Sequence, residues 1–238
     1  MIWWILASLG AFFIKGLCGF ANTLVFTSIL SFGSENRMIS PVEVLLGYPT
    51  NLILAYKERK SIDPKVCIPL TVLVILGSLP GVFLLKMADA GMIKIFCGIV
   101  IVCIGVEMLL REKNPKKAKK SKIGLVCIGI LSGVLCGLYG IGALLGAYIS
   151  RVTTDSHAFK ANICVVFAVE NTFRIVVYAL SGILTFDIFL RAARMFPFML
   201  AGLAAGMKSS SLLNEKTVKK LVIVMLIVSG LALVIHNL

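Results

Sequence analysis

The sequence predicts an all-α integral membrane protein with two related halves. Hydrophobic residues make up 59% of the 238 residues, charged residues only 15%, and the mean hydropathy is +1.00. A soluble domain of this size would need far more polar surface around its core. The apolar residues form continuous blocks and not the alternating pattern of a membrane β-barrel, so we expect several membrane-spanning helices.

The charged residues and the cysteines indicate which partners, metals and cofactors to expect. The formal charge is +13, from 24 lysines and arginines against 11 acidic residues. Basic residues gather in the cytoplasmic loops of membrane proteins, so we expect a lipid bilayer and no nucleic acid as partner. The start, "MIWWILASLGAFFIK", lacks a basic region before its apolar stretch and reads as mature protein. The seven cysteines show no CxxC spacing and predict no metal site and no cofactor.

One basic linker divides the apolar blocks into two groups. The segment "REKNPKKAKKSK" (111–122) separates a first membrane repeat, residues 1–110, from a second, residues 123–238. The apolar blocks lie at roughly 2–32, 41–56, 64–85, 91–110, 123–150, 157–183, 187–207 and 217–236.

The two halves carry the same residue types in the same order, which predicts an internal duplication. Offsets of 120 to 125 residues relate Gly16 to Gly137, Gly19 to Gly140, Asn51 to Asn171, Gly77 to Gly202, Gly81 to Gly206, Lys94 to Lys219 and Gly105 to Gly230.

Each half opens with an apolar block that glycines interrupt. The interruptions are "KGLCGFAN" (15–22) and "GLYGIG" (137–142). The flanking pieces of about 10–14 residues would reach roughly 15–21 Å as helices, which is short of the ~30 Å hydrocarbon layer. Each block is therefore either a re-entrant hairpin of two half-length helices or one long broken span.

Loop charges favour the hairpin. It places the clusters at 57–65, 111–122, 151–160 and 208–220 on one side, with 17 basic residues against 5 opposite; single spans give 13 against 9. The positive-inside rule then puts the linker 111–122 in the cytoplasm, with the protein in the inner membrane. A hairpin plus three full spans per half makes the repeats inverted, which is a recurrent plan of secondary transporters.

The helix breaks predict an anion site. A helix that starts inside the membrane leaves backbone N–H donors unpaired at its positive end, and glycine lets that backbone approach a ligand. The candidate residues at the two breaks are Gly16, Gly19, Asn22, Gly137, Gly140 and Gly142. The alternative is that these glycines only allow helices to pack closely.

Polar side chains inside the apolar blocks are further candidates for binding. Lys15 lies at the first break, and Arg174 shares a helix face with Glu170 and Asn171. Asn51 occupies the position that matches Asn171. The alternatives are snorkelling of Lys15, a Glu170–Arg174 ion pair that neutralises both charges, and hydrogen bonds of the asparagines between helices.

The acidic residues divide into one functional candidate and three interfacial ones. Glu170 is the candidate for proton coupling, because desolvation favours its neutral form and Arg174 its ionised form. Glu43, Asp89 and Glu107 lie near block ends and are interpreted as interfacial. Tyr48, Thr50 and Tyr139 are weaker candidates for lining a site.

At these residues the sequence resembles the sulfite exporter TauE/SafE family over essentially the whole chain. The second copy of the family's repeat reads "SGVL" (132–135) and "GLYGIG" (137–142), and the first is reduced to "KGLCGF" (15–20). The stretches "TNLILAYKERKSID" (50–63) and "NTFRIVVYALSGILTFD" (171–187) match the next segment of the family's repeat, and each ends in Asp.

The resemblance implies a secondary transporter, not an enzyme. Its substrate would be a small anion such as sulfite, a sulfonate or a related organosulfur or carboxylate anion, and a homo-oligomer is left open. Two other functions stay open, a thiol-dependent sulfur relay that uses Cys18 and Cys136 and a non-transporting scaffold. The chain has no GxxxxGK[ST] motif, so we expect no direct use of ATP.

Overall fold

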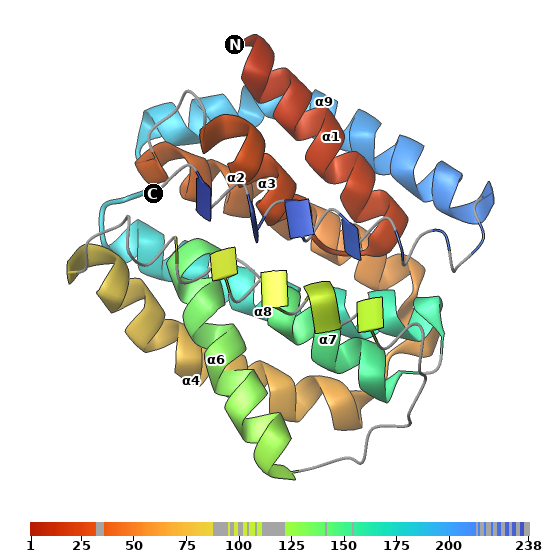
Figure 1. The fold of residues 1–238 in the computed structure, drawn as a ribbon. Coiled ribbons are helices and arrows are strands. Elements are labelled where there is room, and N and C mark those ends of the chain that lie inside the picture. The colour runs from red at the N-terminus through yellow and green to blue at the C-terminus, as the bar shows by residue number, and fades with distance from the viewer. Residues whose placement is uncertain are drawn as a thin grey trace.

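The computed structural model describes residues 1–31, 36–87, 122–140, 142–153 and 155–212, with isolated positions within 95–110 and 214–235. In this part of the chain all regular structure is helical (Figure 1). The helices are α1 (Ile2–Cys18), α2 (Asn22–Ser31), α3 (Asn36–Lys57), α4 (Pro64–Met87), α6 (Lys122–Tyr139), α7 (Ala143–Val152), α8 (Ser156–Leu180) and α9 (Phe186–Leu212), with a 3₁₀ turn at Arg59–Ser61. The predicted blocks 91–110 and 217–236 and the linker 111–122 lie largely outside the described residues.

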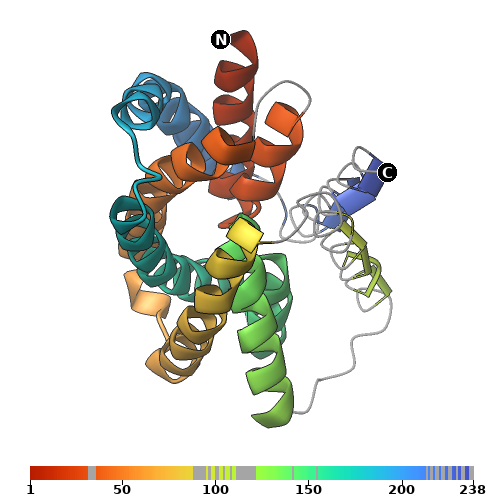
Figure 2. The same cartoon turned by 90° about the vertical axis from the view of Figure 1, so that its left-hand side faces the viewer.

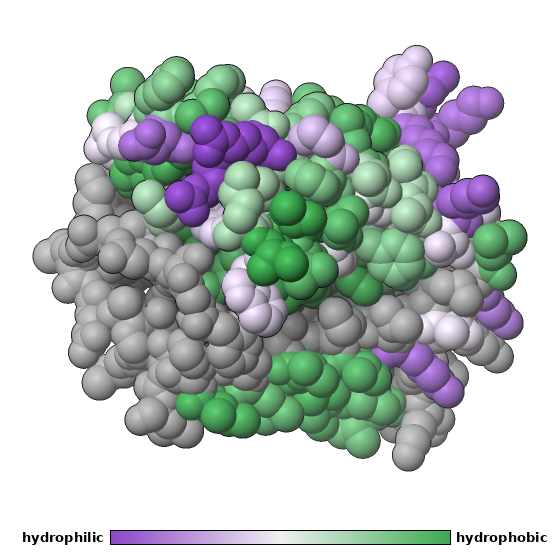
Figure 3. Space-filling model, turned by 90° about the horizontal axis from the view of Figure 1, so that it is seen from above, coloured by the Kyte–Doolittle hydropathy of each residue, from purple (hydrophilic) through white to green (hydrophobic). Residues whose placement is uncertain are grey.

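In the described part of the chain, four helices are long and apolar enough to cross a membrane. They are Met38–Lys57, Pro64–Gly81, Ser156–Leu180 and Phe186–Leu212. Large apolar side chains such as Val72, Leu76, Phe189 and Phe196 face outward on α4 and α9. Figure 3 shows hydrophobic side chains over much of the described surface seen from above. An outer surface of this kind needs lipid around it, so the chain is a multi-pass membrane protein.

Both glycine-rich blocks are broken helices, and the two breaks have the same local geometry. After α1, Gly19 turns into the left-handed region with φ +87°, and its N–H donates to the Lys15 carbonyl at 2.6 Å. After α6, Gly140 does the same with φ +69°, and its N–H donates to the Cys136 carbonyl at 2.7 Å. Glycine suits these positions because it adopts positive φ without a Cβ clash. The chain then turns into α2 and α7, which pack back on α1 and α6.

The first arms of the hairpins are longer than the sequence predicts. Helix α1 has 17 residues and α6 has 18. At a rise of about 1.5 Å per residue they extend roughly 26 and 27 Å, close to the hydrocarbon thickness. The expectation of half-length pieces is therefore wrong for these arms. The reason is that Lys15–Cys18 and Gly137–Tyr139 remain helical, so each break is only about three residues long.

Helices from the first half of the chain pack on helices from the second half. Helix α1 packs on α9, α6 on α4, and α3 on α8 (Figures 1 and 2). Glycines bring the backbones together in the first two pairs. A Cβ on Gly16 would lie 2.5 Å from the Leu203 carbonyl oxygen, and one on Gly137 would overlap the Ser78 carbonyl. These two glycines therefore pack helices, as in the small-residue contacts common between membrane helices.

Alanine at two glycines of α1 tests this packing. Gly16→Ala should lower the free energy of unfolding by about 1–3 kcal/mol, because the added methyl group meets the backbone of α9. The change is read from thermal unfolding of the detergent-solubilised protein. Gly10→Ala is the control in the same helix, since the nearest atom to its added Cβ is Ile29 Cδ1 at 3.9 Å. It should be neutral or stabilising by up to about 1 kcal/mol. Equal stability of the two variants would contradict the close approach of α1 and α9.

Candidate functional site

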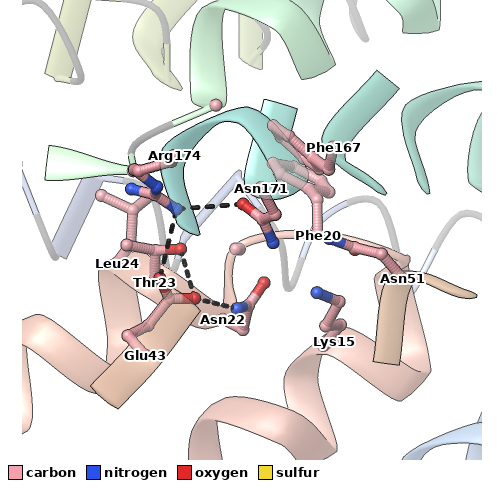
Figure 4. Close-up of a pocket in the computed structure, with 13 residues that line it drawn as sticks. Lys15, Phe20, Asn22, Thr23, Leu24, Glu43, Asn51, Phe167, Asn171 and Arg174 are labelled. Atoms are coloured by element: carbon pink, nitrogen blue, oxygen red, sulfur yellow. Dashed lines mark hydrogen bonds and ion pairs between the residues drawn. The ribbon is translucent and has the colours of Figure 1, made fainter. Parts of the chain in front are cut away.

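The two helix breaks line one small cavity together with α1, α2, α3 and α8, here called the central cavity (Figure 4). Its volume of about 20 Å³ holds about one water molecule, so a larger guest enters only when side chains or helices move. The lining residues are Lys15, Phe20, Ala21, Asn22, Thr23, Leu24, Glu43, Asn51, Gly140, Gly142, Phe167, Asn171 and Arg174.

One side of the central cavity consists of nitrogen donors. Lys15, in the last turn of α1, is 1% exposed and its ammonium donates to the Gly47 carbonyl at 3.3 Å. An ammonium has three donors, and this is the one hydrogen bond it makes within the described part of the chain. Figure 4 shows the side-chain nitrogens of Lys15, Asn51 and Asn171 directed into the same space. We call these three residues the donor side.

The other side is an ion-pair cluster around Arg174, which is 2% exposed. Its Nη1 donates to the Cys136 carbonyl at 3.2 Å, and its Nη2 donates to Asn171 Oδ1 at 3.0 Å. Two carboxylates flank the guanidinium, with Glu170 Oε1 3.6 Å from Nε and Glu43 Oε2 3.7 Å from Nη2. We call Glu43, Glu170 and Arg174 the Arg174 cluster. The guanidinium thus joins α3 and α8 to the last turn of α6.

The position of Glu43 differs from the one predicted from the sequence. Glu43 was expected to be interfacial, but it is 1% exposed and lines the central cavity. Its Oε1 accepts hydrogen bonds from Asn22 Nδ2 at 2.5 Å and from Thr23 Oγ1 at 2.8 Å. Helix α3 begins at Asn36, before the apolar block at 41, so Glu43 lies two turns inside the helix. The spacing of Glu43, Gly47 and Asn51 at every fourth residue is the sequence signal that places all three on the cavity face.

The starts of the two short helices also face the cavity. Asn22 and Thr23 are the first residues of α2, and Gly142 directly precedes α7. Each helix has ten residues, and its first turn contributes N–H donors and the positive end of the helix dipole. The central cavity therefore combines two helix N-termini, an ammonium, a guanidinium and three amides, which are groups suited to an oxyanion, with the carboxylate of Glu43.

Comparison with known protein families identifies the class of this protein. The sequence model described as sulfite exporter TauE/SafE matches residues 4–233. The chain belongs to the sulfite exporter TauE/SafE family. This is a family of membrane transporters, so the chain is a membrane anion transporter and not an enzyme. Comparison with curated proteins and with solved structures found no match.

Not every predicted site residue of this TauE/SafE transporter reaches the central cavity. Lys15, Asn22, Asn51, Gly140, Gly142, Asn171 and Arg174 line it, whereas Gly16, Gly19, Gly137 and Glu170 do not. Gly19 lies against the side chain of Lys160, and Glu170 reaches the cavity only through Arg174. Cys18 and Cys136 are buried and line no part of it.

Four polar or aromatic lining residues are not among the sites predicted from sequence. Glu43 and Thr23 form the hydrogen bond described above, and Phe20 and Phe167 form an aromatic wall (Figure 4). Thr23 directly follows Asn22, so its place at the break was the available signal. Aromatic residues are common in apolar blocks, and nothing in the sequence distinguishes these two phenylalanines from the rest.

Alanine at two left-handed glycines tests the contact between the second break and Arg174. A Cβ on Gly140 would overlap the guanidinium, so Gly140→Ala should displace Arg174 and reduce anion transport at least about tenfold. Gly182→Ala is the matched control, because Gly182 has φ +68° but has no atom within 4 Å of an added Cβ. It carries the same backbone strain of about 1 kcal/mol and should transport normally. Equal losses of anion flux into liposomes would contradict the role of this contact.

Proposed function

We propose that the protein is a secondary transporter, most simply an exporter, for sulfite, sulfonates or related small oxyanions that bind in the central cavity. The observation that carries this proposal is the donor side, where Lys15, Asn51 and Asn171 direct nitrogens into a buried space between two helix starts. An ammonium and two amides that converge on one space are suited to a guest that accepts hydrogen bonds. The direction of transport follows the family alone.

The lining favours an anion with a compact charged head. Phe20 and Phe167 close one end of the cavity with apolar rings, while the donor side and Arg174 supply charged and polar groups (Figure 4). A sulfonate has three oxygens on one sulfur and a carbon substituent on the other side. The donors suit its oxygens, and the phenylalanine rings suit its carbon substituent. Sulfite presents the same oxygens without the carbon group.

We further propose that the two halves are inverted repeats that rock against each other. Reciprocal packing supports this, because α1 pairs with α9 of the other half and α6 pairs with α4. The glycine contacts correspond too. A Cβ on Gly206 would lie 3.0 Å from Gly16 Cα, and one on Gly81 would lie 3.1 Å from Gly137 Cα. The same two offsets that relate the halves in sequence convert one contact into the other.

Such repeats commonly give alternating access to one site near the membrane midplane. Because the cavity has room for about one water molecule in this structure, we assign it to an occluded form between the two open ones. The linker 111–122 would face the cytoplasm from the inner membrane. Glu170, one helical turn from Arg174, is the proposed site of proton coupling.

A transport assay tests the function, with the purified protein reconstituted into liposomes in a known orientation. We expect flux of sulfite, sulfonates or small carboxylates, measured at fixed ionic strength, and no comparable flux of sodium or potassium. Absence of anion flux from folded protein across this panel would contradict the proposal.

Replacing Lys15 tests whether this residue binds the anion or only stabilises the fold. Lys15→Met removes a buried charge that makes one hydrogen bond. The protein should stay folded, because an apolar side chain of similar shape avoids the cost of desolvating that charge. Anion affinity should fall roughly 10- to 100-fold, the usual worth of a charge-assisted hydrogen bond. The matched control is Lys160→Met. Lys160 is also buried but bonds Ser210 at 2.6 Å outside the cavity, so its replacement should leave anion affinity near that of the wild type. Equal effects of the two variants would exclude Lys15 as a ligand.

A further inference from the structure

Glu43 holds the place that an incoming oxyanion would be expected to take. Its carboxylate lies against the first two residues of α2, where Asn22 and Thr23 both donate to Oε1. The positive end of α2, the guanidinium of Arg174 at 3.7 Å and the ammonium of Lys15 also attract this carboxylate. These amide, hydroxyl, helix and guanidinium groups are the ones that recognise sulfonate or carboxylate oxygens.

Among the described residues, only one of the two carboxylate oxygens of Glu43 is hydrogen-bonded, whereas a purely structural ion pair would be expected to pair both. Glu43 Oε2 is buried but makes no hydrogen bond in the described part of the chain, and the same is true of Arg174 Nε and Glu170 Oε1. The distances of 3.6 and 3.7 Å within the cluster exceed those of charge-assisted hydrogen bonds. A carboxylate held by one oxygen can therefore leave its two donors and still remain beside Arg174.

The charges around the cavity also require that something changes when an anion enters. Lys15 and Arg174 bring two positive charges, and Glu43 and Glu170 bring two negative ones when ionised. An added anion makes the sum negative in a low-dielectric space unless one carboxylate moves away or takes up a proton. Of the two, only Glu43 lines the cavity, so it is the carboxylate that the anion meets.

We propose that Glu43 is a tethered anion that occupies the oxyanion position in the occluded form and that the substrate displaces it from Asn22 and Thr23. This inference rests on the proposed function and adds a competitor to the site. It makes Glu43 a residue that sets affinity and keeps the empty site closed. Binding of the substrate then frees α3 from the start of α2, which links occupancy of the cavity to movement of the first hairpin.

The test measures binding of methanesulfonate to the purified full-length protein in detergent by calorimetry at fixed pH and ionic strength. Glu43→Gln keeps the shape and the hydrogen bonds through its amide oxygen but removes the competing charge. We expect it to bind methanesulfonate at least about tenfold more tightly than the wild type. Glu170→Gln is the matched control, because it makes the same change in net charge without touching Asn22 or Thr23, and its gain in affinity should be several-fold smaller.

A second variant keeps the test decisive if Glu43→Gln does not fold. Glu43→Asp retains the charge but draws the carboxylate back by about one methylene, so it competes less well at α2 and should also bind methanesulfonate more tightly than wild type. Unchanged or weaker binding by the position-43 variants would overturn the inference, as would an equal gain in Glu170→Gln. In each of these cases binding by the wild type would leave the transporter proposal standing. If neither the wild type nor any variant binds the probe, the proposed function fails, and this inference fails with it.

Discussion

The guanidinium of Arg174 is the interaction on which the rest of this site depends. It donates to the Cys136 carbonyl in the last turn of α6 and to Asn171 of α8, and it draws Glu43 of α3 toward it. Glu43 in turn holds the first residues of α2. One side chain therefore connects the two helix breaks through a short series of contacts. Because a buried carboxylate without a partner is strongly unfavourable, the loss of this one cation would remove the ion pair of Glu170 and leave Glu43 dependent on Asn22, Thr23 and the more distant charge of Lys15.

Broken helices are one way in which a membrane protein can hold such a cluster of charges. Irregular backbone within the hydrocarbon layer must be shielded by protein or line a polar space. Here the left-handed turns at Gly19 and Gly140 end the first arms, and the short helices start beside the central cavity. The packing glycines have a different function, since they bring α1 onto α9 and α6 onto α4 and so hold the hairpins against the remaining helices. Both features use glycine, one for its backbone freedom and one for its small size.

The backbone of the site could be predicted from the sequence better than its chemistry. Glycine pairs inside apolar blocks predicted both breaks, and helical spacing predicted the shared face of Glu170, Asn171 and Arg174. Sequence alone did not separate Gly16 and Gly137 from the breaks, because a glycine that packs and a glycine that turns look the same. Glu43 was misplaced because composition marks where apolar residues begin, whereas α3 begins earlier, at Asn36. The pairing of Glu43 with α2 depends on tertiary packing, which residue spacing within one helix does not predict.

The proposed duplication would give a symmetric scaffold with asymmetric side chains. At the offsets that relate the halves, Lys15 corresponds to Cys136, and Arg174 corresponds to Leu54. Each half therefore supplies one cation at a position where the other half has a neutral residue. The asparagines at 51 and 171 keep the same residue type on both sides. A symmetric frame permits two similar conformations, while unequal charges give the cavity a donor side and a carboxylate side.

A structure of the protein with bound 2-bromoethanesulfonate, located by the anomalous signal of bromine, is the most direct measurement of where the anion lies. We expect sulfonate oxygens within hydrogen-bond distance of the donor side and of Asn22 and Thr23, from which Glu43 has moved away, with the carbon chain toward Phe20 and Phe167. A bromine signal outside the central cavity, with that cavity unchanged at saturating ligand, would contradict the proposed site.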